Sequence, residues 1–198
     1  MTEIKLGIAG LGTVAQGVLE LIRRNNAIMR QRSGVSLRVV RVASRRAKPE
    51  IDLHGAHFST NIEDLLTDPN VDMILELIGG DTTALDLIRR GLAANKPVVT
   101  ANKAILAVHG NELMAGRGRQ LLRFEAAVAG AIPIIQCLSG GLAANRLGGL
   151  FGIINGTCNY IFGEMEANGT AFDEVLAEAQ RLGYAEADPS FDIDGIDA

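Results

Sequence analysis

Short apolar runs alternate with amphipathic stretches along the first two thirds of the chain, and this rhythm constrains the fold more than any other feature. The apolar runs cover residues 4–10, 36–44, 71–79, 96–102 and 120–130, several of them rich in β-branched residues. The stretches between them space their apolar residues by three or four, as amphipathic helices do. Strands that alternate with helices predict parallel pairing through right-handed crossovers. We therefore expect an α/β fold with a doubly wound parallel sheet of the Rossmann type.

The rhythm changes after residue 132 and predicts a second domain. A helix is expected from Pro133, a strand over residues 149–155, and two helices over 159–169 and 172–182, the last closed by Gly183. We expect domain 1 at residues 1–132 and a second, partial α+β domain at 133–198. The final "DPSFDIDGIDA" follows a helix-initiating pattern, which predicts that the chain is truncated.

Composition argues against several classes of protein. A net charge of -4 and a pI near 5.4 are not typical of a nucleic-acid-binding protein. The apolar runs are too short to cross a bilayer, and the N-terminus lacks the features of a signal peptide. The two cysteines match no CxxC pattern, and the three histidines lack the spacing of a helical metal site. We expect a cytoplasmic protein with reduced thiols.

The first apolar run leads into a glycine-rich turn that is typical of dinucleotide binding. The turn reads Gly10, Leu11, Gly12, Thr13, Val14 and Ala15, a GxGxxA pattern between a predicted strand and a predicted helix. Gly10 permits the tight turn, and Gly12 lets the backbone approach a pyrophosphate at the helix N-terminus. For Gly17, inside the predicted helix, close helix packing is the expected explanation.

The end of the second predicted strand indicates which dinucleotide is bound. NAD-preferring folds place a carboxylate there, whereas this strand ends in "VASRR". Ser44 and Arg45 are better suited to a 2′-phosphate, so NADP(H) is favoured over NAD(H). An exposed loop is the alternative explanation of these arginines.

Six stretches together resemble homoserine dehydrogenase: "GLGTVAQGV", "DMILELIGG", "KPVVTANKAIL", "EAAVAGAIPII", "GIINGTCNYI" and "GYAEADPSFDIDGIDA". They span the chain in order. The resemblance implies an NAD(P)-dependent oxidoreductase that reduces L-aspartate 4-semialdehyde to L-homoserine, on the route to threonine, methionine and isoleucine. It also implies that residues 133–198 are part of a domain for substrate binding and dimerisation. The substrate would be a small amino acid, and the protein a homo-oligomer whose interface this chain largely lacks.

The position of Lys103 indicates a catalytic role. It follows the strand "PVVT", at the carboxyl edge where ligands bind in open α/β sheets. An ammonium there can lie beside the nicotinamide and stabilise charge on a carbonyl oxygen. The resemblance places the family's cofactor-proximal lysine at this position.

Further site residues are implied by the resemblance. It assigns Gly183 to the cofactor and five residues to the substrate: Thr157, Tyr184, Glu186, Asp192 and Asp197. For "NGT", helix capping by Asn155 and Thr157 is the alternative. A Na+ ion would be held by Glu125 and the backbone carbonyls of Val128, Gly130 and Ile132. The family's general acid/base lysine lies four residues beyond the position of Asp197, so we expect little turnover from the 198-residue chain.

Three other functions remain open at this point. Sugar or inositol dehydrogenases share a similar cofactor domain but carry an EKP-type lysine motif, where this chain has "NKPVVTANK". A semialdehyde dehydrogenase would use Cys137 or Cys158 as a nucleophile, although neither is flanked by histidine. A non-catalytic dinucleotide-binding module would bind NADPH without responding to homoserine.

Overall fold

The computed structural model describes residues 2–130, 132–153, 155–185 and 189–194, with backbone only for 191 and 192. The chain divides into two compact units, residues 1–143 and 144–198. The helical segment that begins at Ile134 therefore belongs to the first unit, although the sequence places it at the start of the second domain. The functional division at residue 132 stays a prediction.

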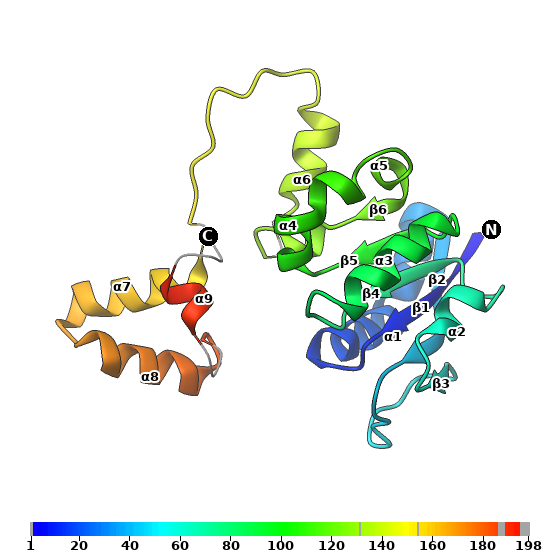
Figure 1. Cartoon of the computed structure of the whole chain (residues 1–198), viewed down its shortest axis with the longest axis horizontal. Helices are drawn as coiled ribbons and strands as arrows, with labels where there is room; N and C mark the ends of the chain where they lie inside the picture. The colour runs from blue at the N-terminus through cyan, green and yellow to red at the C-terminus, as the bar shows by residue number, and fades with distance from the viewer. Residues whose placement is uncertain (1, 131, 154, 186–188, 195–198) are drawn as a thin grey trace. The chain divides into compact units, whose positions relative to one another are not determined.

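The first unit is built on one six-stranded sheet (Figure 1). Its order is β3-β2-β1-β4-β5-β6, and every neighbouring pair is parallel. This is the strand order of the dinucleotide-binding Rossmann fold, so the predicted doubly wound sheet is confirmed. The strands are β1 (Thr2–Ala9), β2 (Val35–Ala43), β3 (His57–Ser59), β4 (Met73–Glu76), β5 (Val98–Thr100) and β6 (Leu122–Arg123).

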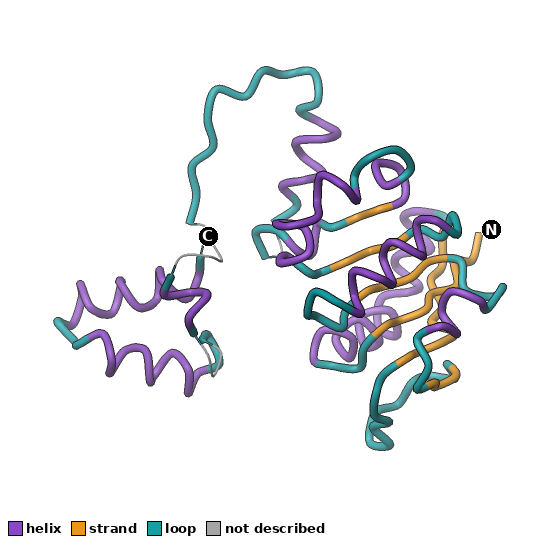
Figure 2. Tube along the Cα trace, viewed as in Figure 1, coloured by secondary structure: helices purple, strands orange, loops and turns teal. Residues whose placement is uncertain are grey.

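Helices cover both faces of this sheet (Figure 2). On one face, α1 buries Ala15, Leu19 and Ile22 against Leu6 and Ile8 of β1. On the other face, a second cluster of buried residues joins the sheet to α2, α3 and α4. The helices of this unit are α1 (Thr13–Ser33), α2 (Glu63–Thr67), α3 (Thr83–Ala93), α4 (Lys103–Leu113), α5 (Gly118–Leu121), α6 (Ile134–Gln136), the 3₁₀ helix η1 (Glu125–Ala127) and the π-helix η2 (Cys137–Gly141).

Two predicted elements differ from the structure at the edges of the sheet. The edge strand β3 was not predicted, because three residues are too few for a periodic pattern to be recognised. The strand expected over 120–130 is formed only at Leu122–Arg123, and η1 follows it. β6 pairs only with β5, itself three residues long, so the sheet supplies no partner for a longer strand.

The second unit has a small helical core. It contains α7 (Gly156–Asn168), α8 (Phe172–Leu182) and α9 (Ser190–Ile193), with Ile161, Val175, Ala179 and Ala185 buried between them. Gly183, in a left-handed conformation, ends α8 as predicted.

The strand expected over 149–155 is not formed in the described part of this segment. Residues 146–153 are a loop in which Leu150, Phe151 and Ile153 are 78%, 97% and 74% exposed. The described residues provide no neighbouring strand, and an extended segment without one has no partner for its backbone hydrogen bonds. Among the described residues, no helix combines the length and the apolar character needed to cross a membrane.

Gly17 is not explained by close packing. A Cβ atom built on it meets no atom of the described residues within 4 Å, so the expectation from the sequence is wrong. Gly118, at the start of α5, is the opposite case, because a Cβ there would lie 1.5 Å from the carbonyl oxygen of Leu113. The turn between α4 and α5 therefore has no room for a side chain at position 118.

These two glycines give a matched pair of substitutions. Gly118→Ala should lower the free energy of unfolding by about 3 kcal/mol or more, because the backbone at Leu113 must move. Gly17→Ala should raise it by about 1 kcal/mol, since alanine favours a helix interior. Urea unfolding followed by circular dichroism measures both. Equal stabilities of the two variants would contradict the close contact at Gly118.

Candidate functional site

The glycine turn that follows β1 is held tightly by its neighbours. Gly10 has a φ of 102°, a conformation that other residues rarely adopt. A Cβ on it would lie 2.5 Å from the carbonyl oxygen of Leu77, and its own N–H donates to the carbonyl of Ala43 at 2.8 Å. The turn thus lies between the ends of β2 and β4, and only glycine fits it.

Gly12 has a different environment. It is the N-cap of α1, and a Cβ there would meet no atom within 4 Å in the described structure. Gly12, Thr13 and Val14 are exposed, whereas Leu11 is buried in the core. Neither a side-chain cap nor an acidic residue occupies the first turn of α1 in this part of the chain. The positive end of the helix dipole therefore faces open space, where an anionic group can approach the backbone.

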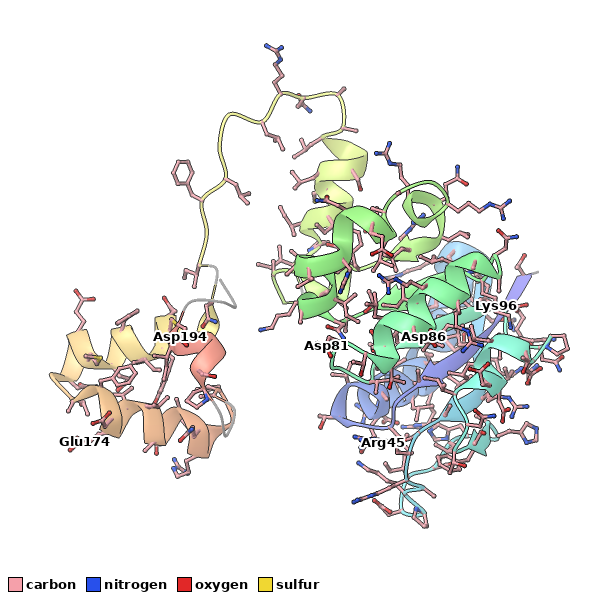
Figure 3. The ribbon with its side chains drawn as sticks, viewed as in Figure 1. Arg45, Asp81, Asp86, Lys96, Glu174 and Asp194 are labelled. Atoms are coloured by element: carbon pink, nitrogen blue, oxygen red, sulfur yellow. The ribbon has the colours of Figure 1, made fainter. Side chains whose placement is uncertain are left out.

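Arg45 follows the end of β2. The carbonyl of Ala43 accepts the hydrogen bond from Gly10, so Ser44 and Arg45 come directly after a residue that contacts the glycine turn. The N–H of Ser44 donates to the carbonyl of Ser59 at 3.0 Å, which fixes the backbone at this point. The Arg45 side chain is exposed in the loop after β2 (Figure 3).

Lys103 is the first residue of α4 and is exposed. Its backbone position is set by Asn102, the N-cap, whose side-chain oxygen accepts from the N–H of Ile105 at 3.1 Å. Because β1, β4 and β5 are parallel neighbours, Lys103 begins its helix at the same edge of the sheet as the glycine turn.

A buried polar group at this edge was missed by sequence reasoning. Glu76, Thr100 and Asn102 are buried, and the Thr100 hydroxyl donates to the Glu76 carboxylate at 2.5 Å. The signal in the sequence was a carboxylate inside the apolar run "DMILELIGG". It marks the point where β4 ends and the loop that follows it begins.

In the second unit, two predicted substrate residues meet. The hydroxyl of Thr157, near the start of α7, donates to the carbonyl of Tyr184 at 2.7 Å. The Tyr184 ring packs edge-to-face against Tyr160, with ring centroids 5.1 Å apart. Desolvation, and to a lesser extent Glu164, raises the pKa of Tyr160 above its ordinary value. Gly183 lies one residue before Tyr184, at the end of α8.

The capping alternative for "NGT" is correct for Asn155 but not for Thr157. The Asn155 side chain accepts from the N–H of Cys158 at 2.8 Å and caps α7. Of the other predicted substrate residues, Glu186 and Asp197 lie outside the described residues. Asp192 lies in α9, but its side chain is outside the described part of the structure.

The predicted cation loop is compact. Both carboxylate oxygens of Glu125 accept backbone N–H groups, from Ile135 and Gln136, each at 2.9 Å. The carbonyl of Ile132 accepts from Ile134 at 2.8 Å, and Gly130 has a φ of 59°. Within the described residues, no three His, Cys, Asp or Glu side chains gather as a metal site, so any cation here would depend on carbonyl ligands such as that of Val128.

Two family models match the chain, in order and with a short gap between them. Residues 10–120 match the NAD-binding domain of homoserine dehydrogenase, and residues 133–198 match homoserine dehydrogenase itself. The glycine turn, Arg45 and Lys103 fall in the first match, and the Thr157–Tyr184 contact falls in the second.

Individual relatives agree with these matches. The homoserine dehydrogenases of Pseudomonas aeruginosa and Bacillus subtilis are 48% and 40% identical over the whole chain. A crystal structure of the enzyme from Thiobacillus denitrificans matches 98% of the chain, with 50% identity and a TM-score of 0.91. A hyperthermophilic archaeal homoserine dehydrogenase in complex with NADPH also matches 98%, with 26% identity and a TM-score of 0.77.

The coverage of the relatives is partial. The chain spans 46% of the length of the Pseudomonas protein and of the Thiobacillus structure, and 47% of the length of the Bacillus protein. It spans 66% of the archaeal structure. The family model of the NAD-binding domain alone covers more than half of the 198 residues, and a second model of the same family covers residues 133–198. The chain therefore belongs to the homoserine dehydrogenase family.

Proposed function

We propose that this chain provides the dinucleotide site and part of the substrate site of an enzyme that interconverts L-aspartate 4-semialdehyde and L-homoserine with NAD(P)H. The observation that carries the proposal is the shared edge of the sheet, where the turn of Gly10, the open N-terminus of α1 and Lys103 come together. Membership of the family supplies the substrate class. The expected homo-oligomer and the cytoplasmic location belong to the same proposal.

Each residue at this edge has a separate role in the proposal. A bound dinucleotide would supply the hydride for the aldehyde carbon. The first turn of α1, from Gly12 to Val14, would bind the pyrophosphate through backbone N–H groups, while Leu11 anchors the turn in the core. Lys103 would stabilise the negative charge that develops on the carbonyl oxygen. Lys103 is the first residue of a helix that Asn102 caps, and this cap fixes the lysine backbone at the edge of the sheet where the dinucleotide would bind.

NADP(H) is the preferred cofactor in this proposal. An exposed arginine at the end of β2, in place of a carboxylate, suits the dianionic 2′-phosphate through charge-assisted hydrogen bonds. The archaeal relative solved with NADPH supports this choice, at 26% identity.

The substrate side of the proposal rests on the second unit. Thr157 and Tyr184 are assigned to the amino-acid substrate, together with Glu186, Asp192 and Asp197. The hydrogen bond from Thr157 to the Tyr184 backbone supports a shared site, because it holds the start of α7 against the segment that leads to the acidic residues. Carboxylates suit an α-ammonium group, which needs charge-assisted acceptors. Gly183 is assigned to the cofactor.

A Na+ ion at the loop 125–132 completes the proposal. Glu125 and the carbonyls of Val128, Gly130 and Ile132 form a set of hard oxygen ligands. Glu125 and Ile132 accept hydrogen bonds within the chain. Each oxygen keeps a second lone pair, so this pairing leaves the ligands available.

The decisive experiment titrates the chain with NADPH while nicotinamide fluorescence is recorded, and repeats the titration with L-homoserine. The chain contains no tryptophan, so protein emission interferes little. We expect saturable NADPH binding and a change in emission on adding homoserine. NADPH binding without any response to homoserine would favour a non-catalytic module, and no NADPH binding would contradict the proposal.

Lys103→Met tests the proposed catalytic residue in the enzyme that contains this chain. The rate of NADP+ reduction by L-homoserine should fall about a hundredfold, as expected when one charge-stabilising donor is removed. Lys103→Arg keeps the charge and should retain more activity than Lys103→Met. Turnover of the methionine variant at the wild-type rate would remove Lys103 from the mechanism.

Gly10→Ala and Gly12→Ala separate folding from binding. Gly10→Ala should lower the free energy of unfolding by about 3 kcal/mol, because the new Cβ meets the Leu77 carbonyl at a positive φ. Gly12→Ala should change it by less than about 1 kcal/mol, since the position is open, and should weaken NADPH binding at least about tenfold. Urea unfolding and NADPH titration provide the two measurements. Normal NADPH affinity in Gly12→Ala would contradict pyrophosphate binding at this turn.

Arg45→Ala tests the cofactor preference. We expect about tenfold weaker NADPH binding, from the loss of a charge-assisted hydrogen bond, and little change for NADH. Arg32→Ala, in the exposed last turn of α1, is the control and should affect neither cofactor. A parallel loss of NADH and NADPH affinity in Arg45→Ala would show that the arginine does not read the 2′-phosphate.

A further inference from the structure

The carboxylate of Glu76 has no part in the function proposed above, although it lies within the candidate site. Glu76 is the last residue of β4 and is completely buried. In the sheet register it stands between Ala9, the last residue of β1, and Thr100, the last residue of β5. The glycine turn follows Ala9 directly, and α4 begins at Lys103, shortly after Thr100.

One oxygen of this carboxylate holds the loop that follows β4. Oε1 accepts the N–H groups of Ile78 and Gly79, at 2.9 and 3.4 Å. The same loop contacts the glycine turn, because the Leu77 N–H donates to the carbonyl of Ala9 at 2.9 Å and the Leu77 carbonyl packs against Gly10. The position of the glycine turn therefore depends on the loop after β4, which is held by its hydrogen bonds to Glu76.

The other oxygen leads to the start of α4. Oε2 accepts the hydroxyl of Thr100 at 2.5 Å, and the Thr100 oxygen in turn accepts the N–H of Asn102 at 3.0 Å. The Asn102 side chain donates to the carbonyl of Gly80 at 2.6 Å. The hydrogen bonds thus close a ring from β4 through β5 to the helix that begins with Lys103, and back to the loop.

The chemistry of this group argues for more than stability. Burying an ionised carboxylate is unfavourable unless donors compensate, and an apolar residue of the same size often fills such a space as well. Glu76, Thr100 and Asn102 are the only buried polar side chains in the described part of the chain, and all three belong to this ring. A fully satisfied buried network specifies one arrangement of its backbone segments.

We infer that Glu76 is a positioning residue for the dinucleotide: it holds the loop 77–80 against the glycine turn and, through Thr100 and Asn102, sets the start of α4. The inference rests on the proposed function, because the segments it joins are those assigned to the cofactor. Glu76 acts through them and does not itself touch the dinucleotide.

Glu76→Met and Glu76→Gln form the test. Methionine keeps the volume but removes both acceptors. Glutamine keeps a carbonyl for the two N–H groups and replaces the acceptor that faces Thr100 by an amide N–H, which can donate to the Thr100 oxygen. Glu76→Met should accelerate hydrogen exchange at the Ile78 and Gly79 amides at least about tenfold and weaken NADPH binding by a similar factor. Glu76→Gln should restore both to within about threefold of the unaltered chain.

If Glu76→Met does not fold, Thr100→Val provides the test in its place. It removes only the hydroxyl that joins the two halves of the ring, and we expect weaker NADPH binding in a folded chain. Thr67→Val is the control, because the Thr67 hydroxyl donates to Glu63 within α2, away from the ring. Thr67→Val should leave NADPH affinity unchanged.

The outcomes separate this inference from the proposed function. Unchanged exchange and unchanged NADPH affinity in folded Glu76→Met, or unchanged affinity in Thr100→Val when Glu76→Met is unfolded, would overturn the inference. If the unaltered chain binds no NADPH, the proposed function fails. In that case unaltered exchange at Ile78 and Gly79 in folded Glu76→Met, or at the Asn102 amide in Thr100→Val, would overturn the inference as well.

Discussion

The close approach of Gly10 to the backbone of Leu77 is the contact on which the candidate site depends. It requires a residue without a side chain and with a positive φ, and it brings the turn after β1 against the loop after β4. The hydrogen bond from Gly10 to Ala43 adds the end of β2 to the same junction. Three strand ends are thereby fixed together. The N-terminus of α1 projects from this junction, which explains why the helix can present its backbone N–H groups to an anion.

The parallel sheet explains why residues far apart in the chain share one edge. Each crossover helix returns the chain to the opposite edge, so all the carboxyl ends of the strands lie together. The glycine turn, Arg45 and Lys103 each follow one of these ends. The buried hydrogen-bonded ring of Glu76, Thr100 and Asn102 joins the carboxyl ends of β4 and β5. The surface residues can then differ in chemistry while their backbone positions stay fixed.

Only part of the predicted substrate site in the second unit lies within the described residues. Thr157 and Tyr184 are joined by a hydrogen bond, and the helices around them share a small core. The segment before α7 leaves Leu150, Phe151 and Ile153 exposed, although its residue pattern is that of a strand. The residue pattern specifies which face of a strand would be buried, but the segment forms a strand only when a neighbouring strand pairs with it. The same limit applies to β6, which is shorter than its apolar run.

The sequence by itself determined the class of the fold, the glycine turn and the positions of Arg45 and Lys103, because local periodicity and strand ends are properties of neighbouring residues. It also identified the helix cap at Gly183. Only the tertiary structure decided that Gly10 is constrained by Leu77 while Gly12 and Gly17 are open, since these contacts join residues separated by long stretches of chain. The role of Glu76 was hidden for the same reason: its partner Thr100 lies 24 residues further along the chain, on a different strand, and only folding brings it to the carboxylate.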